Sequence, residues 1–267
     1  MHRTIVVTAF GLAATCAQAQ TPVAPDSSLR SADTALDLSA PFHTRSPWQF
    51  VVTQGPAETD YGGNPAPGLL TLCLTKQKAG PCVSKPIETI RPFDKGSLDW
   101  GPRYLEVAKV VYPQGTPLLE IVTASMHAGD GGQVVITQLL KYDRGKDAFE
   151  QVYVHDTGAN NNEETRFVTV GTLKGDVISA DPTNKAPYGY WIVVSRFTSA
   201  QTYQQVLRYR SATTYNDGNN LAVIDSEMPN IERRLGLWKL GQPLPLPAHR
   251  AKPCEHPALK HMELWCG

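Results

Sequence analysis

The chain from residue 48 to about residue 225 repeats one pattern of hydrophobic and polar positions. Short runs of β-branched and aromatic residues alternate with clusters of Gly, Pro, Asn and Asp, which is typical of strands joined by turns. No long segment has the 3.6-residue period of an amphipathic helix. The expected strands are 48–53, 69–74, 104–112, 118–125, 133–142, 149–155, 166–170, 176–180, 190–197, 203–211 and 221–225. We therefore expect an all-β fold, with antiparallel strands in a small propeller-like or two-sheet sandwich architecture.

Two local patterns refine this expectation. The runs 133–142 and 149–155 flank the turn 143–147, in which Gly145 is expected to take the positive φ that a bulged hairpin turn requires. The run 190–194 is apolar at successive positions, which predicts a central strand buried on both faces. A further turn is expected at 216–219, which contains an Asp-Gly pair.

The segments 117–158 and 177–218 share one order of elements: strand, loop with Gly or Pro, strand, polar turn and strand. Each ends in an Asp-x-Gly or Asp-Gly turn. Over residues 104–225 this arrangement resembles the blades of secreted integrin-type (FG-GAP-like) β-propeller repeat proteins. The resemblance implies propeller blades, although the regularly spaced Asp-rich calcium loop of that family is not cleanly present.

The two ends of the chain differ in composition from this central part. Residues 1–19 combine a basic start, an apolar run and Ala17-Gln18-Ala19, which predicts a cleaved signal peptide and export to the periplasm or the medium. Residues 20–46 are rich in Pro, Ser, Ala and Asp and are expected to be a flexible leader. The β domain is expected over 47–240 and a proline-rich, disulfide-closed tail over 241–267. Lipid attachment at Cys16 is an alternative, but Thr15 fits that signal poorly.

The most helix-like and the most proline-rich segments of the chain lie at the end of the expected β domain and at the start of the tail. Residues 229–240 are expected to start as a short helix capped by Asn230. The run 243–247 has proline at every second position, which favours an extended segment that straps the domain or recruits a partner.

Four cysteines remain after removal of the signal peptide: Cys73, Cys82, Cys254 and Cys266. In an oxidising compartment an even number of cysteines predicts two disulfides. Four cysteines allow three connectivities, and the spacing favours Cys73 with Cys82 and Cys254 with Cys266. Copper or zinc binding by the tail is the alternative. Its candidate ligands are His249, Cys254, His256, His261, Met262 and Cys266.

Charge and motifs narrow the classes of function. The 25 basic and 25 acidic residues balance, which disfavours nucleic acid as the main partner. After the signal peptide no run approaches the roughly 18 apolar residues of a membrane-spanning helix. The common hydrolase, nucleotide-binding and metalloprotease motifs are also missing. These observations favour a binding protein over an enzyme.

The polar loop 155–164 and the glycine-rich loop 127–132 are the candidate sites for chemistry. Asp156, Asn160, Asn162 and Glu164 offer the hard oxygen ligands that calcium prefers, although Asn and Asp also make ordinary turns.

A carbohydrate-active hydrolase would require paired carboxylates. Asp130 with Glu163 or Glu164 would supply them, and His127 would lie beside Asp130. A plain surface loop is the simpler interpretation.

The aromatic and basic residues of 188–215 suggest a contact surface. Arg208 and Arg210 are expected to share one side of a strand, near Tyr190, while Leu207 and Tyr209 face the other side. Tyrosine and arginine dominate binding hot spots. The sequence therefore predicts an exported, non-catalytic binding protein, of inhibitor or immunity type, that recognises a protein or a cell-envelope glycan.

Overall fold

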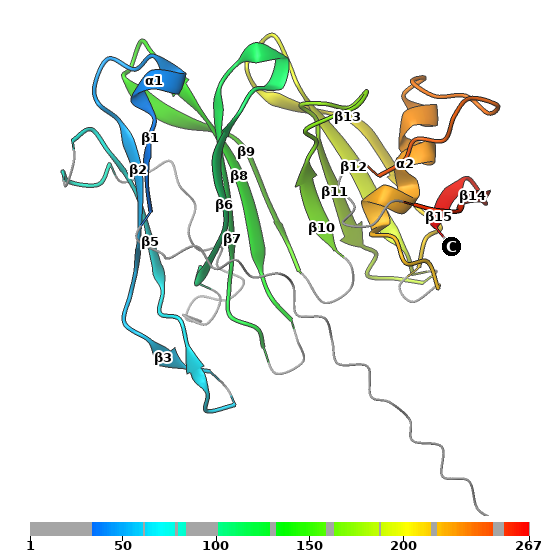
Figure 1. Ribbon diagram of the computed structural model, residues 1–267, viewed down its shortest axis with the longest axis horizontal. Coiled ribbons are helices and arrows are strands. Elements are labelled where there is room, and N and C mark those ends of the chain that lie inside the picture. Colours follow the sequence, from blue (N-terminus) through cyan, green and yellow to red (C-terminus); the bar gives the residue numbers. More distant parts are fainter. Residues whose placement is uncertain are drawn as a thin grey trace, which may run out of the picture.

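Three antiparallel sheets lie face to face in the computed structural model, which describes residues 34–60, 62–77, 80–83, 101–128, 132–158, 163–186, 188–214, 218–247 and 254–266 (Figure 1). The first sheet contains β1 (Thr34–Asp37), β2 (Gln49–Gln54) and β5 (Leu70–Thr75). The second contains β6 (Tyr104–Val111), β7 (Leu118–Ala124), β8 (Val135–Asp143) and β9 (Ala148–Thr157). The third contains β10 (Glu164–Phe167), β11 (Val177–Pro182), β12 (Tyr190–Phe197) and β13 (Tyr203–Arg210).

The remaining elements surround this stack. Helix α2 (Val223–Arg234) covers the outer face of the third sheet, and a hairpin of β14 (Pro257–Lys260) and β15 (Glu263–Cys266) packs beside it (Figure 1). The short elements are α1 (Ser39–Phe42), η2 (Pro113–Gly115), β3 (Glu58–Thr59) and β4 (Pro65–Ala66). Neither α2 nor α1 is long and apolar enough to cross a bilayer, within the part of the chain that the structure describes.

The two repeated sequence segments occupy equivalent places in the second and third sheets. Residues 117–158 contain β7, β8 and β9, and residues 177–218 contain β11, β12 and β13. In both sheets a preceding strand, β6 or β10, completes a four-stranded antiparallel meander whose spatial order follows the sequence. The sequence pattern therefore reflects a structural repeat, although the described sheets do not close into a ring.

Alternate residues of the middle strands enter different cores. In β7, Leu118 packs between the second and third sheets, and the next residue, Leu119, packs between the first and second. Successive side chains of a strand point to opposite faces, so a sheet buried on both faces reads as a continuous apolar run. A third core lies between the third sheet and α2, where Ile192 and Ile224 are buried. As its sequence predicts, β12 is central within its sheet.

Glu227 fixes α2 on the third sheet through a wholly buried carboxylate. The hydroxyls of Tyr209 and Thr213 donate to it at 2.6 and 2.7 Å, and Ser211 and Asn230 donate as well. Burial together with the neighbouring Glu227 charge raises the pKa of Tyr209. All four donors are neutral, and hydrogen bonds satisfy the carboxylate without an ion pair to any residue that the structure describes.

The beginning of the fold differs from the sequence expectation. The segment 20–46 was expected to be flexible, but β1 pairs with β2 and α1 follows it, so the described fold begins at residue 34. Leu38 and Phe42 are buried in the first core, and this burial orders a segment whose composition alone favours disorder. The two-sheet alternative is also wrong, because the structure has three stacked sheets.

The region around residue 225 is helical, where the sequence predicted a strand over 221–225 and a helix from 229. Helix α2 includes the end of the first segment and the start of the second, and it contains Pro229 in its interior. The carboxylate of Glu164 accepts the Ile224 N–H at 2.9 Å and so satisfies one of the free donors at the helix start. Packing of the helix on the third sheet thus outweighs the cost of an internal proline.

The cysteines form the two local disulfides that their spacing favours. Cys73 pairs with Cys82 and Cys254 with Cys266, with Cα–Cα separations of 5.1 and 5.4 Å. In the tail, the second disulfide joins Cys254, shortly before β14, to Cys266 at the end of β15. His261 and Met262 form the connecting turn, both with positive φ, a geometry that matches strand twist in tight hairpins.

The β8–β9 hairpin forms as predicted, but its positive φ belongs to Asp147 and not to Gly145. The Asp147 carboxylate accepts hydrogen bonds from Ser46 Oγ at 2.6 Å, Trp48 Nε1 at 2.9 Å and Tyr142 Oη at 2.6 Å. Lys76 Nζ lies 2.9 Å from it. Burial alone would raise the pKa of Asp147, but these donors outweigh burial and hold the pKa well below its usual range. Asp147 therefore ties the first sheet to the second.

Asp147→Asn should lower the free energy of unfolding by about 2 kcal/mol at pH 7, because hydrogen bonds to a charged group are lost. A depressed folded-state pKa contributes stability above the unfolded value of about 4, and this stability disappears as the pH falls through the folded value. Denaturant unfolding at pH 7 and at pH 3 should therefore show a difference that shrinks in acid. Asp143→Asn is the control, because Asp143 bonds within its own turn. Equal loss in both variants would contradict the role of Asp147.

Candidate binding pocket

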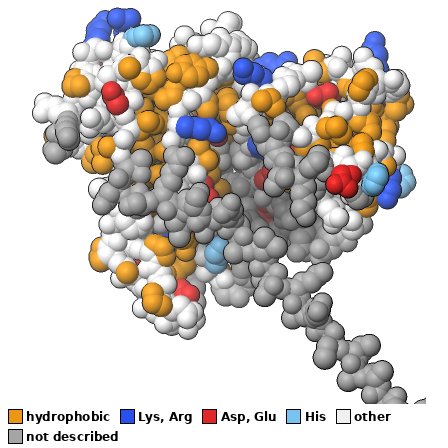
Figure 2. Space-filling model, viewed as in Figure 1, with side chains coloured by type: hydrophobic (Ala, Val, Ile, Leu, Met, Phe, Trp, Pro, Cys, Tyr) orange, Lys and Arg blue, Asp and Glu red, His pale blue; other side chains and the backbone are white. Residues whose placement is uncertain are grey.

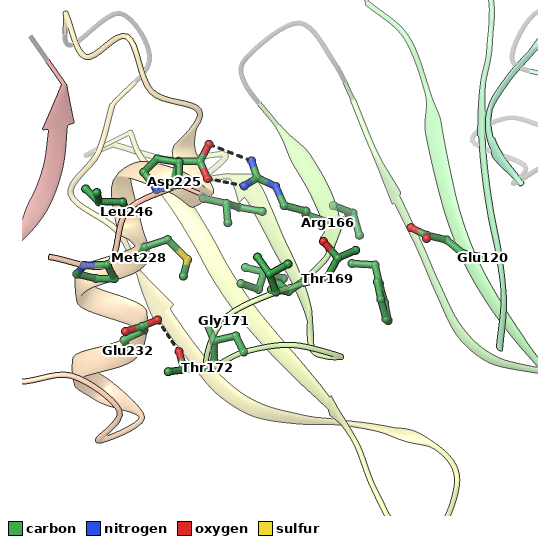
Figure 3. Close-up of a pocket in the computed structure, with 18 of the residues that line it drawn as sticks. Glu120, Arg166, Thr169, Gly171, Thr172, Asp225, Met228, Glu232 and Leu246 are labelled. Carbon is green, nitrogen blue, oxygen red and sulfur yellow. Dashed lines mark hydrogen bonds and ion pairs between the residues drawn. The ribbon is translucent and has the colours of Figure 1, made fainter. Parts of the chain in front are cut away.

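A cavity of about 760 Å³ lies between the second sheet, the third sheet and α2 (Figure 3). Residues of β6 and β7 form one wall, β10 and the segment after it form the second, and α2 with the proline-rich run forms the third. Most lining side chains are apolar: Val107, Val122, Phe167, Val168, Val170, Leu173, Ile178, Ile224, Met228, Pro243, Pro245, Leu246 and Pro247. The indole Nε1 of Trp238 donates to the Pro243 carbonyl at 2.9 Å and anchors the start of the proline-rich run.

Arg166 closes one end of the pocket with two carboxylates. Its Nη2 lies 2.8 Å from Glu164 and 3.4 Å from Asp225, and its Nη1 contacts Asp225 as well. Burial alone would lower the pKa of Arg166, but the charges of Glu164 and Asp225 outweigh it and raise the pKa. Figure 3 shows the two dashed contacts between Arg166 and Asp225, which join β10 to the first turn of α2. Two carboxylates of the fold thus neutralise this guanidinium.

Glu120 faces the pocket from β7, on the opposite side from Arg166 (Figure 3). Its side chain is 6% exposed, whereas that of its partner Lys109 is 50% exposed, and Lys109 Nζ lies 3.3 Å from Oε2. Burial raises the pKa of Glu120, and Lys109 partly opposes the rise. The pair therefore places a poorly solvated carboxyl on an otherwise apolar wall.

Among the three carboxylates that line the pocket, that of Glu232 is neutralised least by the fold. Its residue is 8% exposed, and Thr172 Oγ1 donates to Oε1 at 2.6 Å, as the dashed line in Figure 3 shows. No ion pair between described residues includes Glu232, in contrast to Glu120 and Asp225. A buried carboxylate without a cation strongly favours a hydrogen-bond donor or a positive charge nearby. The pocket thus combines apolar walls with one acceptor that lacks a basic partner.

The candidate calcium and hydrolase residues do not come together as one site among the described residues. Asp130, Asn160 and Asn162 lie outside the described residues, and Asp156 and Glu164 belong to different strands. Glu164 binds Arg166 and the start of α2, as described above.

Two other residues of those loops can be placed. Glu163 accepts the Gly158 N–H at 2.6 Å, so its carboxylate closes the loop between β9 and β10. His127 is exposed after β7. Neither residue lines the pocket.

The residues of the predicted contact surface do not all lie at the surface. Tyr190 is 2% exposed and belongs to the core under α2, so it is not part of an exposed face of the described structure. Arg208 and Arg210 are exposed, whereas Tyr209 is buried with α2, so the two sides of β13 divide as the sequence predicts. The aromatic partner of Arg208 is Trp191, whose ring centre lies 4.0 Å from the guanidinium carbon.

The candidate metal ligands of the tail are used by the hairpin. The disulfide withdraws Cys254 and Cys266 as thiolates, and His261 and Met262 make the turn. His249 lies outside the described residues. No group of three His, Cys, Asp or Glu with metal-binding geometry occurs among the residues that the structure describes.

Apart from the proline-rich run, the pocket residues carry no recognisable sequence signal. Glu120 and Arg166 sit within strand-like runs, and Asp225 and Glu232 belong to a helix that was divided between two predicted elements. The proline-rich run was the one useful sign, because it was expected to lie against the domain and it lines the pocket. Charged residues inside apolar runs, such as Glu120 in 118–124, are the pattern that would have indicated these positions.

Comparison with protein-family models, with curated proteins and with solved structures finds no match to this chain. The resemblance to integrin-type propeller repeats therefore stays a prediction.

Glu120→Gln should be more stable than the wild type at pH 7, by on the order of 1 kcal/mol, because a carboxylate is removed from a poorly solvated wall and Lys109 can return to water. A carboxyl whose pKa is raised in the folded state destabilises the fold as the pH rises above the pKa of the unfolded state, which is about 4.3. The advantage of the variant should thus disappear near pH 3 in denaturant titrations. Glu106→Gln, at an exposed position of β6, is the control. Lower stability of Glu120→Gln at pH 7 would contradict this account.

Proposed function

We propose that this chain is an exported, non-catalytic binding protein, and that the pocket holds an apolar ligand or side chain that carries one amine. The observation that supports this proposal is Glu232, a buried carboxylate on an apolar wall that accepts a hydrogen bond from the neutral hydroxyl of Thr172. Apolar surface would supply most of the binding free energy, and the carboxylate would fix the orientation of the ligand.

The charges of the lining agree with a cationic group on the ligand. The two basic side chains, Lys109 and Arg166, are each paired with carboxylates. An anionic ligand would compete with these carboxylates and be repelled by Glu232, whereas an ammonium group can approach Glu232 directly. The proposal therefore predicts that the pocket prefers a cationic ligand to an anionic one.

Export is proposed from the sequence of residues 1–19 and is supported by the two disulfides, since disulfides persist in oxidising compartments. In this proposal the repeated four-stranded sheets are blades of an incomplete, propeller-like stack. The ligand would then lie beside β6 and β10, the first strands of the two four-stranded sheets.

Isothermal titration with octylamine, octanol and octanoate tests this function, because the three probes share one apolar chain and differ in charge. Octylamine should bind most tightly and octanoate least. Glu232→Gln should weaken octylamine binding about tenfold while leaving octanol binding unchanged, as expected when one charged partner is removed. Equal binding of all three probes, or no binding of octylamine, would refute the proposal.

Two further variants separate recognition from stability. Glu255→Gln alters an exposed glutamate of the tail and should leave all three affinities unchanged. Thr172→Val removes the hydroxyl that contacts Glu232 but keeps the carboxylate, so octylamine should still bind. Loss of octylamine binding in Thr172→Val would show that the Thr172–Glu232 contact is structural, and it would count against recognition by Glu232.

A further inference from the structure

Among the strands that the structure describes, β13 forms an outer edge of the third sheet, because it pairs with β12 on one side and ends the strand order. Just after this strand, the Ser211 N–H donates to the Tyr190 carbonyl at 2.8 Å. In an antiparallel ladder, residues alternate between bonding to the neighbouring strand and pointing away from it. Tyr209, two residues before Ser211, therefore bonds to β12, and the main-chain groups of Arg208 and Arg210 point off the free edge.

The same two residues carry guanidinium groups that the fold does not neutralise. Both are exposed, and no ion pair between described residues includes either one. By contrast, Arg166 and Arg196, which belong to the same sheet, are each held by a carboxylate.

Arg208 is moreover held in place before any partner arrives. Its guanidinium lies over the ring of Trp191, 4.0 Å from the ring centre, and Trp191 stands opposite Arg210 in the strand register. A guanidinium stacked on an aromatic ring loses little further freedom when its N–H groups bind a carboxylate. The edge thus presents one preorganised cation and a second one two residues later.

Charges on an edge strand normally prevent pairing with other strands. Here the charges are both positive and repeat every second residue, which is the spacing of side chains on one face of an extended chain. A strand with carboxylates at alternate positions would satisfy the free main-chain groups and both guanidiniums at once. A neutral or basic strand would leave those charges unpaired.

We propose that the free edge of β13 docks an extended acidic segment of a partner protein, which adds to the third sheet as a further strand. The carboxylates of that segment would face Arg208 and Arg210 at alternate positions, and its main chain would bond to theirs. Main-chain bonds would supply sequence-independent affinity, and the two arginines would select acidic partners. This surface is independent of the pocket.

The test uses three synthetic peptides of the length of β13, eight residues, against the full chain. One alternates threonine and glutamate, one has the same composition with its glutamates consecutive, and one is the alternating peptide with N-methylated main-chain amides. Fluorescence anisotropy should show binding of the alternating peptide. Binding should be about tenfold weaker for the consecutive isomer and absent for the N-methylated peptide.

Arg208→Ala and Arg210→Ala should each weaken the alternating peptide severalfold, and Arg233→Ala, an exposed arginine of α2, should not. Hydrogen exchange should show new protection of the Arg208 and Arg210 amides in the complex, a signal that simple ion pairing would not give.

Equal binding of the two isomeric peptides, retained binding after N-methylation, or unchanged exchange at these amides would overturn strand addition. Binding of an acidic polysaccharide in place of the alternating peptide would likewise overturn it.

Discussion

The fold depends on one constraint: the second and third sheets must bury both of their faces. A single four-stranded sheet with two apolar faces is unstable in water, so each middle sheet requires a covering layer on both sides. The first sheet covers the second, the second and third cover each other, and α2 covers the third, as Figure 1 shows. Because every layer is required by its neighbour, the stack ends where a layer has one polar face. Helix α2 provides that end, since Arg233 and Arg234 are exposed while Ile231 is buried.

Apolar contact alone does not fix how these layers align, and buried polar contacts supply that information. Asp147 joins the first sheet to the second, and Glu227 joins α2 to the third sheet. Within the third sheet, Asp176 is 4% exposed and holds Arg196 at 2.8 Å. Such groups are costly to bury unless their hydrogen bonds are satisfied, so they penalise any shifted arrangement more than they stabilise the correct one. On the face shown in Figure 2, basic side chains occur in small scattered groups among hydrophobic ones. That distribution agrees with charges used as local contacts.

The sequence predicted the strands well and the helix poorly, for physical reasons. Strands 190–197 and 203–211 were visible because β-branched and aromatic residues mark a strand whichever layer it faces. Helix α2 was not visible because its apolar positions are few and Pro229 interrupts them, so its structure depends on the third sheet and on Glu164. The pocket could not be predicted, since its three walls come from segments that are far apart in the sequence. The side chains that matter there, such as Glu120, look like ordinary strand residues until the layers assemble.

The charged groups discussed above therefore fall into two sets: those with partners of opposite charge or sufficient hydrogen-bond donors within the fold, and those without them. Asp147, Asp225 and Glu227 have the donors they need within the fold, and their removal is expected to reduce stability. Glu232 lacks a cation, and Arg208 and Arg210 lack carboxylates, among the residues that the structure describes. A fold under selection for stability alone gains nothing from a buried carboxylate on a cavity wall or from two guanidiniums beside unpaired main-chain groups. We propose that other molecules complete these positions: an amine for the pocket and a carboxylate-bearing strand for the edge of β13.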